Sequence, residues 1–505
     1  MVVLKDFLKK HWPWLSLATV FWYFSLPAIR AELLDFGGDS AQYIILAENL
    51  SKGLGYHLTN YPGDPFCFLY PPVFPGILSL VAALFGRDLY LMSLLISLLG
   101  FGGVLLTYRL LKKYASKSIA YLSALSLAVS ADYIVYSAKL IRSEIPYIFF
   151  SCAALLALTS YLKEESWQSR KGWLAAGLLV LAYFTRYFGI TLFAGALISL
   201  AASRTAQKAK KILLIALVFL TPFTAWQTAK FFYHGQKISQ LSVLASADIY
   251  NPAAGTLFQH PGALLGRFIN GLDYYSAILA LSVVAYTGPV HNPFSAIIAI
   301  AVFSIIVGGA FVCFRKDKSC VFGYYVLLSF FMALAWPAKE GVRLIIPILA
   351  FLLFYFWVGL QALCARSAAQ IGKAVFVGAA CVILGTNVNY SYRFIRLTPS
   401  APDKTQADYR AVHGWIKRNL DPGGLIMSRR PTITAYYTGH QAIVYAFSPN
   451  PDDIRSQVEK NMVKYIVSDG MSREEQRYLA PFVAKYADRL KLRYAAGNCA
   501  VFEVL

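Results

Sequence analysis

The stretch around which the chain is organised, residues 35–75, reads DFGGDSAQYIILAENLSKGLGYHLTNYPGDPFCFLYPPVFP. It lies between a first apolar segment and a long series of further ones. It gathers acids, aromatic residues, glycines and prolines into one polar loop. A chemical centre is therefore expected around Asp39, provided that residues from elsewhere in the chain complete it.

The composition is that of an integral membrane protein. Of the 505 residues, 57% are hydrophobic and only 14% are charged, whereas roughly a quarter are charged in an ordinary soluble domain. The net charge of +21 would suit a nucleic-acid-binding protein. However, many of the lysines and arginines form short clusters between apolar segments, as expected for cytoplasmic loops that also attract anionic lipid headgroups. Membrane lipids are the expected partners, and nucleic acid is not.

The apolar segments predict about eleven membrane spans in a bundle of helices. The basic clusters then lie on the cytoplasmic side, which puts the N-terminus in the cytoplasm and the C-terminus outside a plasma (inner) membrane. The predicted spans cover residues 12–34, 88–110, 118–136, 145–162, 172–184, 188–202, 212–230, 293–314, 320–336, 344–363 and 373–390.

Two further apolar segments leave the topology open. Residues 73–85 are fewer than the about 20 needed to cross the hydrocarbon, so they are interpreted as an interfacial or re-entrant helix. Residues 276–286 are interpreted as a second interfacial helix, and whether either segment crosses the membrane is left open.

From residue 392 the composition changes to that of a soluble domain with alternating short strands and helices. The sequence therefore predicts a mostly helical, polytopic membrane domain over residues 1–391 and an extracytoplasmic α/β domain over residues 392–505. Within the first domain, residues 35–87 form an outer loop with interfacial helices. Nucleotide-binding and zinc-protease motifs are absent from the second domain.

Charged residues at the ends of spans are the candidates for chemistry, because a charge at the bilayer centre costs at least about 2.5 to 3.5 kcal/mol. A carboxylate can act as a general base, and an arginine can stabilise the charge of a phosphate leaving group. Four clusters are predicted on the outer face, namely Asp35/Asp39/Tyr43, Lys139/Arg142/Glu144, Arg186 and Lys339/Glu340/Arg343.

Each candidate has a structural alternative. Asp39 follows a glycine pair and could cap the helix predicted from residue 40 instead of acting as a base. Glu144 and Arg142 could be an interfacial ion pair, Arg343 could extend to the headgroups, and tyrosines such as Tyr43 are more often packing residues. The histidines share no ligand spacing, so a metal site built on them is not expected.

The loop also carries a resemblance. The segments DSAQYIILAENLSKGLGY and YPPVFPGILSLVAALFG resemble the first outer loop of membrane glycosyltransferases of the C-type fold, of the protein mannosyltransferase and lipid A aminoarabinose transferase kind. Further similarities are Arg142-Ser143-Glu144-Ile145-Pro146, Thr185-Arg186 between two short helices, Arg343 with Pro347, and the α/β tail. These motifs occur in the same order as in the family, and together they cover nearly the whole chain.

The resemblance implies a glycosyltransferase of the cell envelope that takes a sugar, a hexose or a pentose, from a polyprenyl-phosphate donor with inversion. It implies that Asp39 is the general base and that Glu144 positions the acceptor or a divalent ion. Arg343 and Arg186 would hold the donor phosphate, and Tyr43, Tyr70 and Arg142 complete the predicted substrate-binding set. The acceptor would be a lipid, a glycan or a protein.

Two positions depart from the family pattern. Asp39-Ser40 stands where many relatives carry Asp-Glu, so a metal requirement is left open and no metal ligand is assigned. Tyr70 stands where the aminoarabinose transferases have a lysine, which argues against that lipid A substrate.

Two alternatives of other classes remain at this point, a transporter or lipid flippase and a non-catalytic subunit that presents substrate. Charges near the midplane and repeated halves would favour a transporter, but the charges cluster at one face and no repeat is visible.

Overall fold

The computed structural model describes residues 2–29, 37–234, 240–246, 255–257, 259–260, 262–287, 292–397, 404–470 and 472–505. The chain divides into two compact units. The first comprises residues 1–30, 90–249 and 254–398, and the second comprises residues 31–89, 250–253 and 399–505. The opening loop thus groups with the C-terminal residues, and the predicted boundary at 391/392 stays a prediction.

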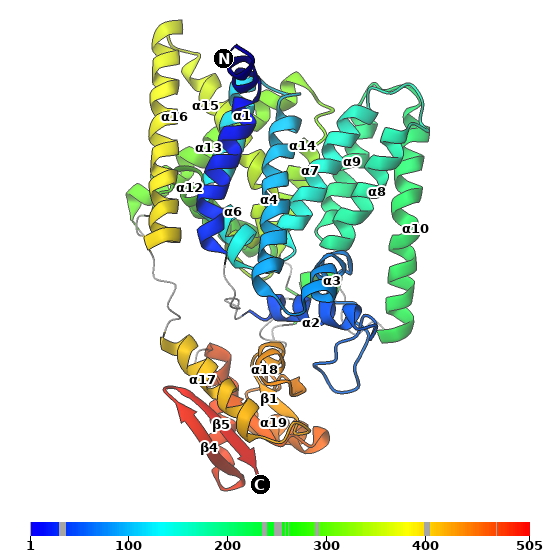
Figure 1. Ribbon diagram of the computed structural model, residues 1–505, viewed down its shortest axis with the longest axis vertical. Helices are drawn as coiled ribbons and strands as arrows, with labels where there is room; N and C mark the ends of the chain where they lie inside the picture. Colours follow the sequence, from blue (N-terminus) through cyan, green and yellow to red (C-terminus); the bar gives the residue numbers. More distant parts are fainter. Residues whose placement is uncertain are drawn as a thin grey trace. The chain divides into compact units, whose positions relative to one another are not determined.

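The first unit is a bundle of helices (Figure 1). Its helices are α1 (Val2–Ser25), α4 (Leu89–Leu111), α5 (Lys117–Val129), α6 (Ala131–Ile134), α7 (Glu144–Tyr161), α8 (Arg170–Thr185), α9 (Gly189–Ala202), α10 (Lys208–His234), α11 (Gln240–Ala245), α12 (Gly262–Val284), α13 (Pro293–Lys316), α14 (Gly323–Ala335), α15 (Leu349–Cys364) and α16 (Ala369–Tyr392), with short 3-10 or π turns at Leu26–Ala28, Val135–Lys139, Gly341–Leu344, Ile346–Ile348 and Arg393–Leu397.

Among the described residues, six helices are long and apolar enough to cross a membrane. The number is seven when the bent pair of α5 and the segment Ala131–Lys139 counts as one span. The other four predicted spans fall on α1, α8, α9 and α14, which are shorter or less apolar. The count of eleven therefore stays a prediction.

Close packing around α15 forms the centre of this unit. Residues Leu349–Trp357 of α15 are all buried, and the Trp357 indole donates a hydrogen bond of 3.0 Å to Ser126 Oγ of α5. Helices α13 and α15 approach through Gly309 and Gly359, where a Cβ would collide with the facing backbone of Tyr355 and Ile305. Small residues allow such backbone contact between membrane helices.

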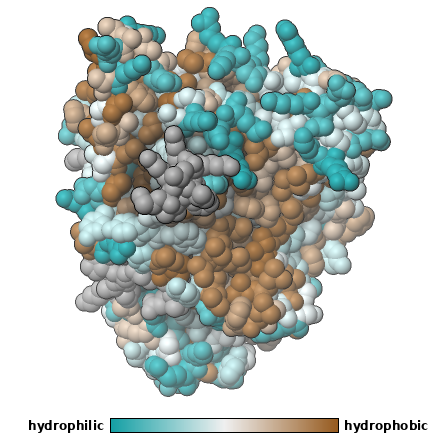
Figure 2. Space-filling model, turned by 45° about the horizontal axis from the view of Figure 1, so that its top comes forward, coloured by the Kyte–Doolittle hydropathy of each residue, from teal (hydrophilic) through white to brown (hydrophobic). Residues whose placement is uncertain are grey.

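The outer helices of the unit expose apolar side chains instead. Ile300 of α13 is 64% exposed and Val382 of α16 is 65% exposed. The face drawn in Figure 2 carries a broad hydrophobic surface, with hydrophilic side chains gathered above it. A surface of this kind suits contact with lipid tails, because soluble monomers rarely expose apolar patches of such extent.

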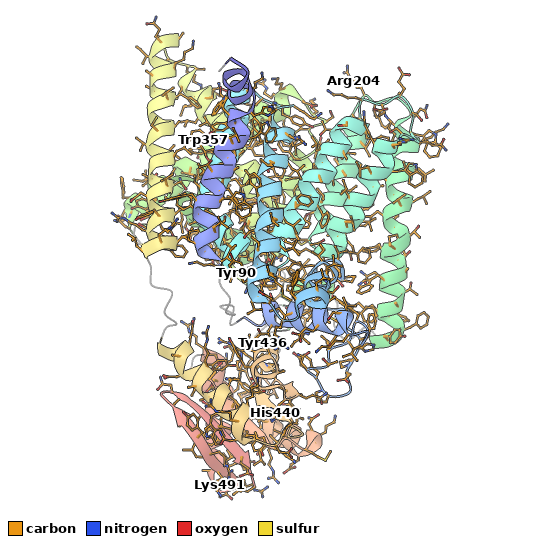
Figure 3. All side chains as sticks on the ribbon, viewed as in Figure 1. Tyr90, Arg204, Trp357, Tyr436, His440 and Lys491 are labelled. Carbon is orange, nitrogen blue, oxygen red and sulfur yellow. The ribbon has the colours of Figure 1, made fainter. Side chains whose placement is uncertain are left out.

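The predicted break between residues 184 and 188 is confirmed, since α8 ends at Thr185 and α9 begins at Gly189. Arg204, in the basic loop after α9, and Tyr90, near the start of α4, lie at opposite ends of the unit (Figure 3). Because α9 has 14 residues, Arg186 and Arg204 are separated by about 21 Å along its axis.

Two predicted boundaries were wrong. The first helix covers Val2–Ser25, and the chain then enters a 3-10 turn at Leu26–Ala28, where Pro27 has no backbone N–H for a helical hydrogen bond. Residues 30–34 of the predicted span lie outside the described residues. Residues 276–286 do not form a separate short helix. They lie mostly in α12, which starts at Gly262 and buries Tyr275, Leu279 and Val283.

The second unit holds a small sheet flanked by helices (Figure 1). Its helices are α2 (Asp39–Ser51), α3 (Val73–Phe85), α17 (Lys404–Asn419), α18 (Pro431–Thr438), α19 (Pro451–Asn461) and α20 (Ala480–Lys485), with short π and 3-10 turns at Glu475–Leu479 and Ala487–Arg489. Its strands are β1 (Ile426–Ser428), β2 (Ala442–Ile443), β3 (Tyr465–Ser468), β4 (Leu490–Ala496) and β5 (Cys499–Val504).

The strand order is β2-β1-β3-β5-β4. Strand β1 is parallel to β2 and β3, with Ile426 opposite Ala442 and Tyr465, and β5 is antiparallel to β3 and β4. The predicted α/β character of the tail is thus confirmed, and its core is formed by residues such as Met427, Ile454 and Ile466.

The opening loop is joined to this sheet. The backbone N–H of Ala442, in edge strand β2, donates to the carbonyl oxygen of Asn60 at 3.0 Å. Arg87 pairs with Glu48 of α2, and its guanidinium lies 4.8 Å from the centre of the Tyr436 ring of α18. Figure 3 labels Tyr436. These bonds fix α2 and the loop that follows it against the C-terminal elements.

Candidate active site

Glu144 is the centre of a charged cluster in the first unit. It is the first residue of α7, and its side chain is fully buried. Its Oε1 accepts hydrogen bonds from Arg186 Nη1 at 2.6 Å and from Arg343 Nε at 2.8 Å. Burial of a carboxylate is costly unless it is paired, so these two arginines are what allow Glu144 to be buried while charged.

Both arginines lie in turns between helices and not within a helix. Arg186 occupies the turn between α8 and α9, and Arg343 lies in the 3-10 turn Gly341–Leu344 before α15. Arg343 Nη1 also donates to Glu340 Oε2 at 3.0 Å, and the Trp336 indole donates to Glu340 Oε1 at 3.0 Å. Glu340 therefore holds the second side of the Arg343 guanidinium.

Arg142 adds a third positive charge close enough to act electrostatically on Glu144. Three of the predicted site residues, Glu144, Arg186 and Arg343, thus meet directly, and Arg142 lies near them. Lys139 is held elsewhere, 5.7 Å from the centre of the Phe394 ring. Within the described residues, no hydrogen bond reaches Oε2 of Glu144, although this atom is buried.

This cluster does not suit a divalent cation. One oxygen of Glu144 is occupied by two guanidinium groups, and their positive charge would repel a metal ion. Nowhere in the described ranges do three His, Cys, Asp or Glu side chains lie together as a metal site needs. The positive surroundings of Glu144 favour an anion such as a phosphate instead.

Asp39 is the centre of a second cluster, in the second unit. It is the first residue of α2, and the preceding Gly38 has a φ of 95°, a left-handed conformation that glycine adopts without strain. Asp39 Oδ1 accepts a hydrogen bond of 2.7 Å from the Tyr70 hydroxyl. The Tyr70 ring lies edge-on to the Tyr43 ring, with centroids 5.0 Å apart, so the three predicted residues of this loop lie together.

The surroundings of Tyr70 in the loop keep its hydroxyl protonated. Burial, and then the charge of Asp39, raise the pKa of the Tyr70 hydroxyl well above its ordinary value. The hydroxyl therefore stays protonated and remains a donor to Asp39. Tyr56 holds the backbone on the other side of Tyr70, since its hydroxyl donates to the carbonyl oxygens of Tyr70 and Pro71 at 3.1 and 3.2 Å.

The alternative of Asp39 as a helix cap takes a specific form. The cap position is occupied by Gly38, which has no side chain to bond, and Asp39 lies inside the first turn of α2. An acid in the first turn is stabilised by the helix dipole. Asp35, the other acid of the predicted cluster, lies outside the described residues.

A cavity of 410 Å³ opens beside this cluster in the second unit. Tyr70 and Gln42 of the opening loop and Thr432 of α18 are among its lining residues. The two amides of Gln42 and Asn60 bond reciprocally at 3.1 and 3.3 Å. We did not predict the cavity, Gln42 or Asn60. The only sequence signal for Gln42 is its position one helical turn after Asp39, on the same face of the helix.

The chain is similar to known proteins both in sequence and in structure. Residues 70–226 match the family model described as dolichyl-phosphate-mannose-protein mannosyltransferase. No curated protein matches this sequence.

Solved structures are similar over most of the chain. The archaeal oligosaccharyltransferase AglB from Archaeoglobus fulgidus, in complex with an inhibitory peptide and a dolichol-phosphate, has a TM-score of 0.59 and 12% identity, over 91% of this chain and 70% of that one. ArnT from Cupriavidus metallidurans, in the apo state, has a TM-score of 0.58 and 12% identity, over 97% and 96% of the two chains. The same ArnT bound to undecaprenyl phosphate has a TM-score of 0.56 and 12% identity, over 97% of each chain.

Identities this low establish the fold, and the family match lies within it. The resemblance expected from the opening loop is thereby confirmed at the level of the fold, since the chain has the fold of the membrane glycosyltransferases AglB and ArnT, and residues 70–226 match the mannosyltransferase family model.

Proposed function

We propose that this protein transfers a sugar from a polyprenyl-phosphate donor to an acceptor on the extracytoplasmic side of the plasma membrane, with inversion of the anomeric centre. The observation that carries the proposal is the pairing of Arg186 and Arg343 on the buried Glu144, in a fold shared with a neighbour solved with undecaprenyl phosphate. A donor whose sugar is already activated on a lipid phosphate requires no nucleotide-binding motif.

Arg186 and Arg343 are proposed to bind the donor phosphate. Arginine is suited to this role because its planar guanidinium offers several N–H donors and keeps its charge. Glu144 would position both guanidinium groups, because its Oε1 accepts from each of them. Arg142 would add positive charge that stabilises the departing phosphate.

Asp39 is proposed to be the general base. A hydroxyl or amine of the acceptor attacks the anomeric carbon while its proton passes to the Asp39 carboxylate. The bond between that carbon and the phosphate oxygen breaks, and polyprenyl phosphate leaves with the electron pair. The Tyr70 hydroxyl, which already donates to Asp39 Oδ1, would orient the carboxylate, and Tyr43 would support the Tyr70 ring.

The two clusters belong to different units, and each is assigned its own role. We propose that the Asp39 carboxylate and the cluster of Glu144, Arg142, Arg186 and Arg343 both serve the transfer on the outer side of the membrane. Support comes from the distance of Arg186 from the basic loop after α9, since positive loops are retained in the cytoplasm. The residues of the Glu144 cluster do not fit a metal, and the mechanism uses none.

The test is a product assay on the purified full chain with a panel of radiolabelled polyprenyl-phosphate sugars, hexoses and pentoses, and lipid, glycan and peptide acceptors. The proposal predicts release of the carrier phosphate in step with the labelled product. A transporter would move the lipid across vesicles without breaking the phosphate–sugar bond. A subunit that only presents substrate would leave the donor intact, so an intact donor across the panel contradicts the proposal.

A further inference from the structure

The cavity beside Asp39 has a lining that points to a particular class of ligand. It is formed entirely by residues of the second unit, and its volume of 410 Å³ is within the about 300 to 1,000 Å³ of small-molecule sites. The lining residues are Gln42, Leu58, Tyr61, Pro62, Pro65, Leu69, Tyr70, Thr432, Ile443 and Asn461.

Hydrogen bonds hold the polar wall of this cavity in place. Thr432 Oγ1 lies 3.3 Å from the Tyr61 hydroxyl and 3.4 Å from Gln42 Oε1. Tyr61 begins a tight turn in which the Asp64 N–H donates to the Tyr61 carbonyl oxygen at 3.2 Å. These side chains of the lining are therefore preorganised, which lowers the entropic cost of binding.

Asn461 supplies a further hydrogen-bonding group to the lining. It is the last residue of α19, and its Nδ2 donates to the Gln457 carbonyl oxygen at 2.8 Å. No hydrogen bond among the described residues uses its amide oxygen, which can therefore accept one from a ligand.

The chemistry of the lining excludes several ligands. None of the ten lining residues is charged, so a phosphate, a carboxylate or an ammonium group would lack a counter-charge. A lipid tail would leave the amide oxygen of Asn461 without a hydrogen bond, which costs binding free energy. A ligand with both hydroxyl groups and apolar C–H faces matches the amides, the hydroxyls and the tyrosine rings.

A peptide is the main competitor, and the nearby sheet edge argues against it. Extended peptides commonly bind by adding a strand to an exposed edge. The edge strand at the cavity is β2, and the N–H of Ala442 in this strand is already bonded to the Asn60 carbonyl oxygen at 3.0 Å. The opening loop therefore occupies the position that an added strand would take.

We propose that this cavity is the binding site for a neutral saccharide, which serves as the acceptor of the transfer. The inference rests on the proposed function, because it identifies the class of acceptor for Asp39. Two lining residues connect the cavity to that carboxylate. Tyr70 donates to Asp39 Oδ1 at 2.7 Å, and Gln42 follows Asp39 by one helical turn. An acceptor hydroxyl bound here would be activated by Asp39.

The experiment is a calorimetric titration of the full chain in lipid nanodiscs without donor. The probes are mannotriose, galactotriose and arabinotriose, with trigalacturonic acid and an uncharged octapeptide as competitors of other classes. At least one neutral trisaccharide is expected to bind saturably. Asn461→Ala and Tyr61→Ala should each weaken binding about tenfold, the effect of losing one buried hydrogen bond or ring contact.

Asn419→Ala is the matched control. Asn419 also ends a helix, and its Nδ2 also donates to the carbonyl oxygen four residues before it, that of Trp415, at 2.8 Å, but it does not line the cavity. This variant should bind as the unaltered protein does. The proposal is overturned if no neutral trisaccharide binds saturably, if the charged trisaccharide or the peptide binds in its place, or if binding is the same in Asn461→Ala, Tyr61→Ala and Asn419→Ala.

The saccharide-binding proposal and the proposed function can be refuted independently of each other. If every donor stays intact while Asn461-dependent saccharide binding persists, the proposed function is wrong and the cavity assignment stands. If transfer occurs and the acceptor KM is the same in Asn461→Ala and Asn419→Ala, the cavity assignment is wrong and the proposed function stands.

Discussion

Glu144→Gln is the substitution that tests the arginine cluster most sharply. Glu144 is fully buried and accepts from Arg186 at 2.6 Å and from Arg343 at 2.8 Å. The glutamine keeps the shape of the side chain but leaves two guanidinium groups without their shared negative charge. Removing one partner of a buried ion pair costs about 3 to 5 kcal/mol.

The structure places the expected cost at the lower end of this range. The Arg186 and Arg343 side chains remain 12% and 23% exposed, and Arg343 keeps its bond to Glu340 at 3.0 Å. Water and Glu340 therefore offset part of the loss, and we expect about 3 kcal/mol of destabilisation. The matched control is Glu340→Gln, since Glu340 is 27% exposed and pairs with one arginine, so its loss should cost about 1 kcal/mol.

Equilibrium unfolding of the purified variants in mixed micelles measures both values. The double variant Glu144→Gln/Arg186→Met should recover part of the loss, because it removes one of the uncompensated charges. The reasoning is refuted if Glu144→Gln is no more destabilising than Glu340→Gln, or if the second substitution adds its full cost to the first.

Three further outcomes are expected. Arg343→Ala should raise the donor KM about tenfold or more through loss of a charge-assisted bond to phosphate, with Arg315→Ala at a predicted cytoplasmic loop as control; an altered acceptor preference with unchanged donor KM contradicts it. Tyr70→Phe should lower kcat about tenfold because the Asp39 carboxylate loses its 2.7 Å donor; unchanged kcat removes Tyr70 from the site. Burial and Asp469 raise the pKa of Glu475 to about 8, so the folded chain holds a proton that the unfolded chain has lost, and stability should fall from pH 6.5 to 8. Glu475→Gln should flatten that fall in thermal unfolding, and an unchanged slope contradicts the assignment.

Local signals in the sequence were enough to predict many elements. The segment 73–85 matches α3 at both ends, because Pro72 precedes it and Gly86 ends it. The break at Arg186 was predicted because two apolar segments flank a polar tripeptide. The alternating short helices and strands predicted after residue 391 are present, among them α17, α19, β1 and β3, and they follow from periodicity and turn residues.

The extent of α12 depends on long-range packing, which could not be predicted from the sequence. Polar residues such as Asn270 and Asp273 lower the hydropathy of α12, and the burial of Tyr275, Leu279 and Val283 stabilises it as a helix from Gly262 onward. A periodic pattern cannot report this burial, because it depends on helices distant in sequence.

The candidate residues were predicted by type, whereas their partners were not. Glu144 and Arg343 are 199 positions apart, and Asp39 and Tyr70 are 31 apart. These hydrogen bonds form only when the tertiary fold brings the distant segments together. The cavity itself had no signal in the sequence, since Gln42 and Asn461 belong to separate elements whose proximity no local pattern encodes.

The most direct test of the central claim compares the unaltered chain with Asp39→Asn in one turnover of a polyprenyl-phosphate sugar that the panel identifies as the donor. The account predicts that the unaltered chain releases polyprenyl phosphate in equal amount to the transferred sugar. It predicts that Asp39→Asn, with unchanged membrane insertion and unfolding midpoint, is slower by about 10² to 10⁴, the contribution of a general base. Turnover by Asp39→Asn at nearly the normal rate would contradict the account.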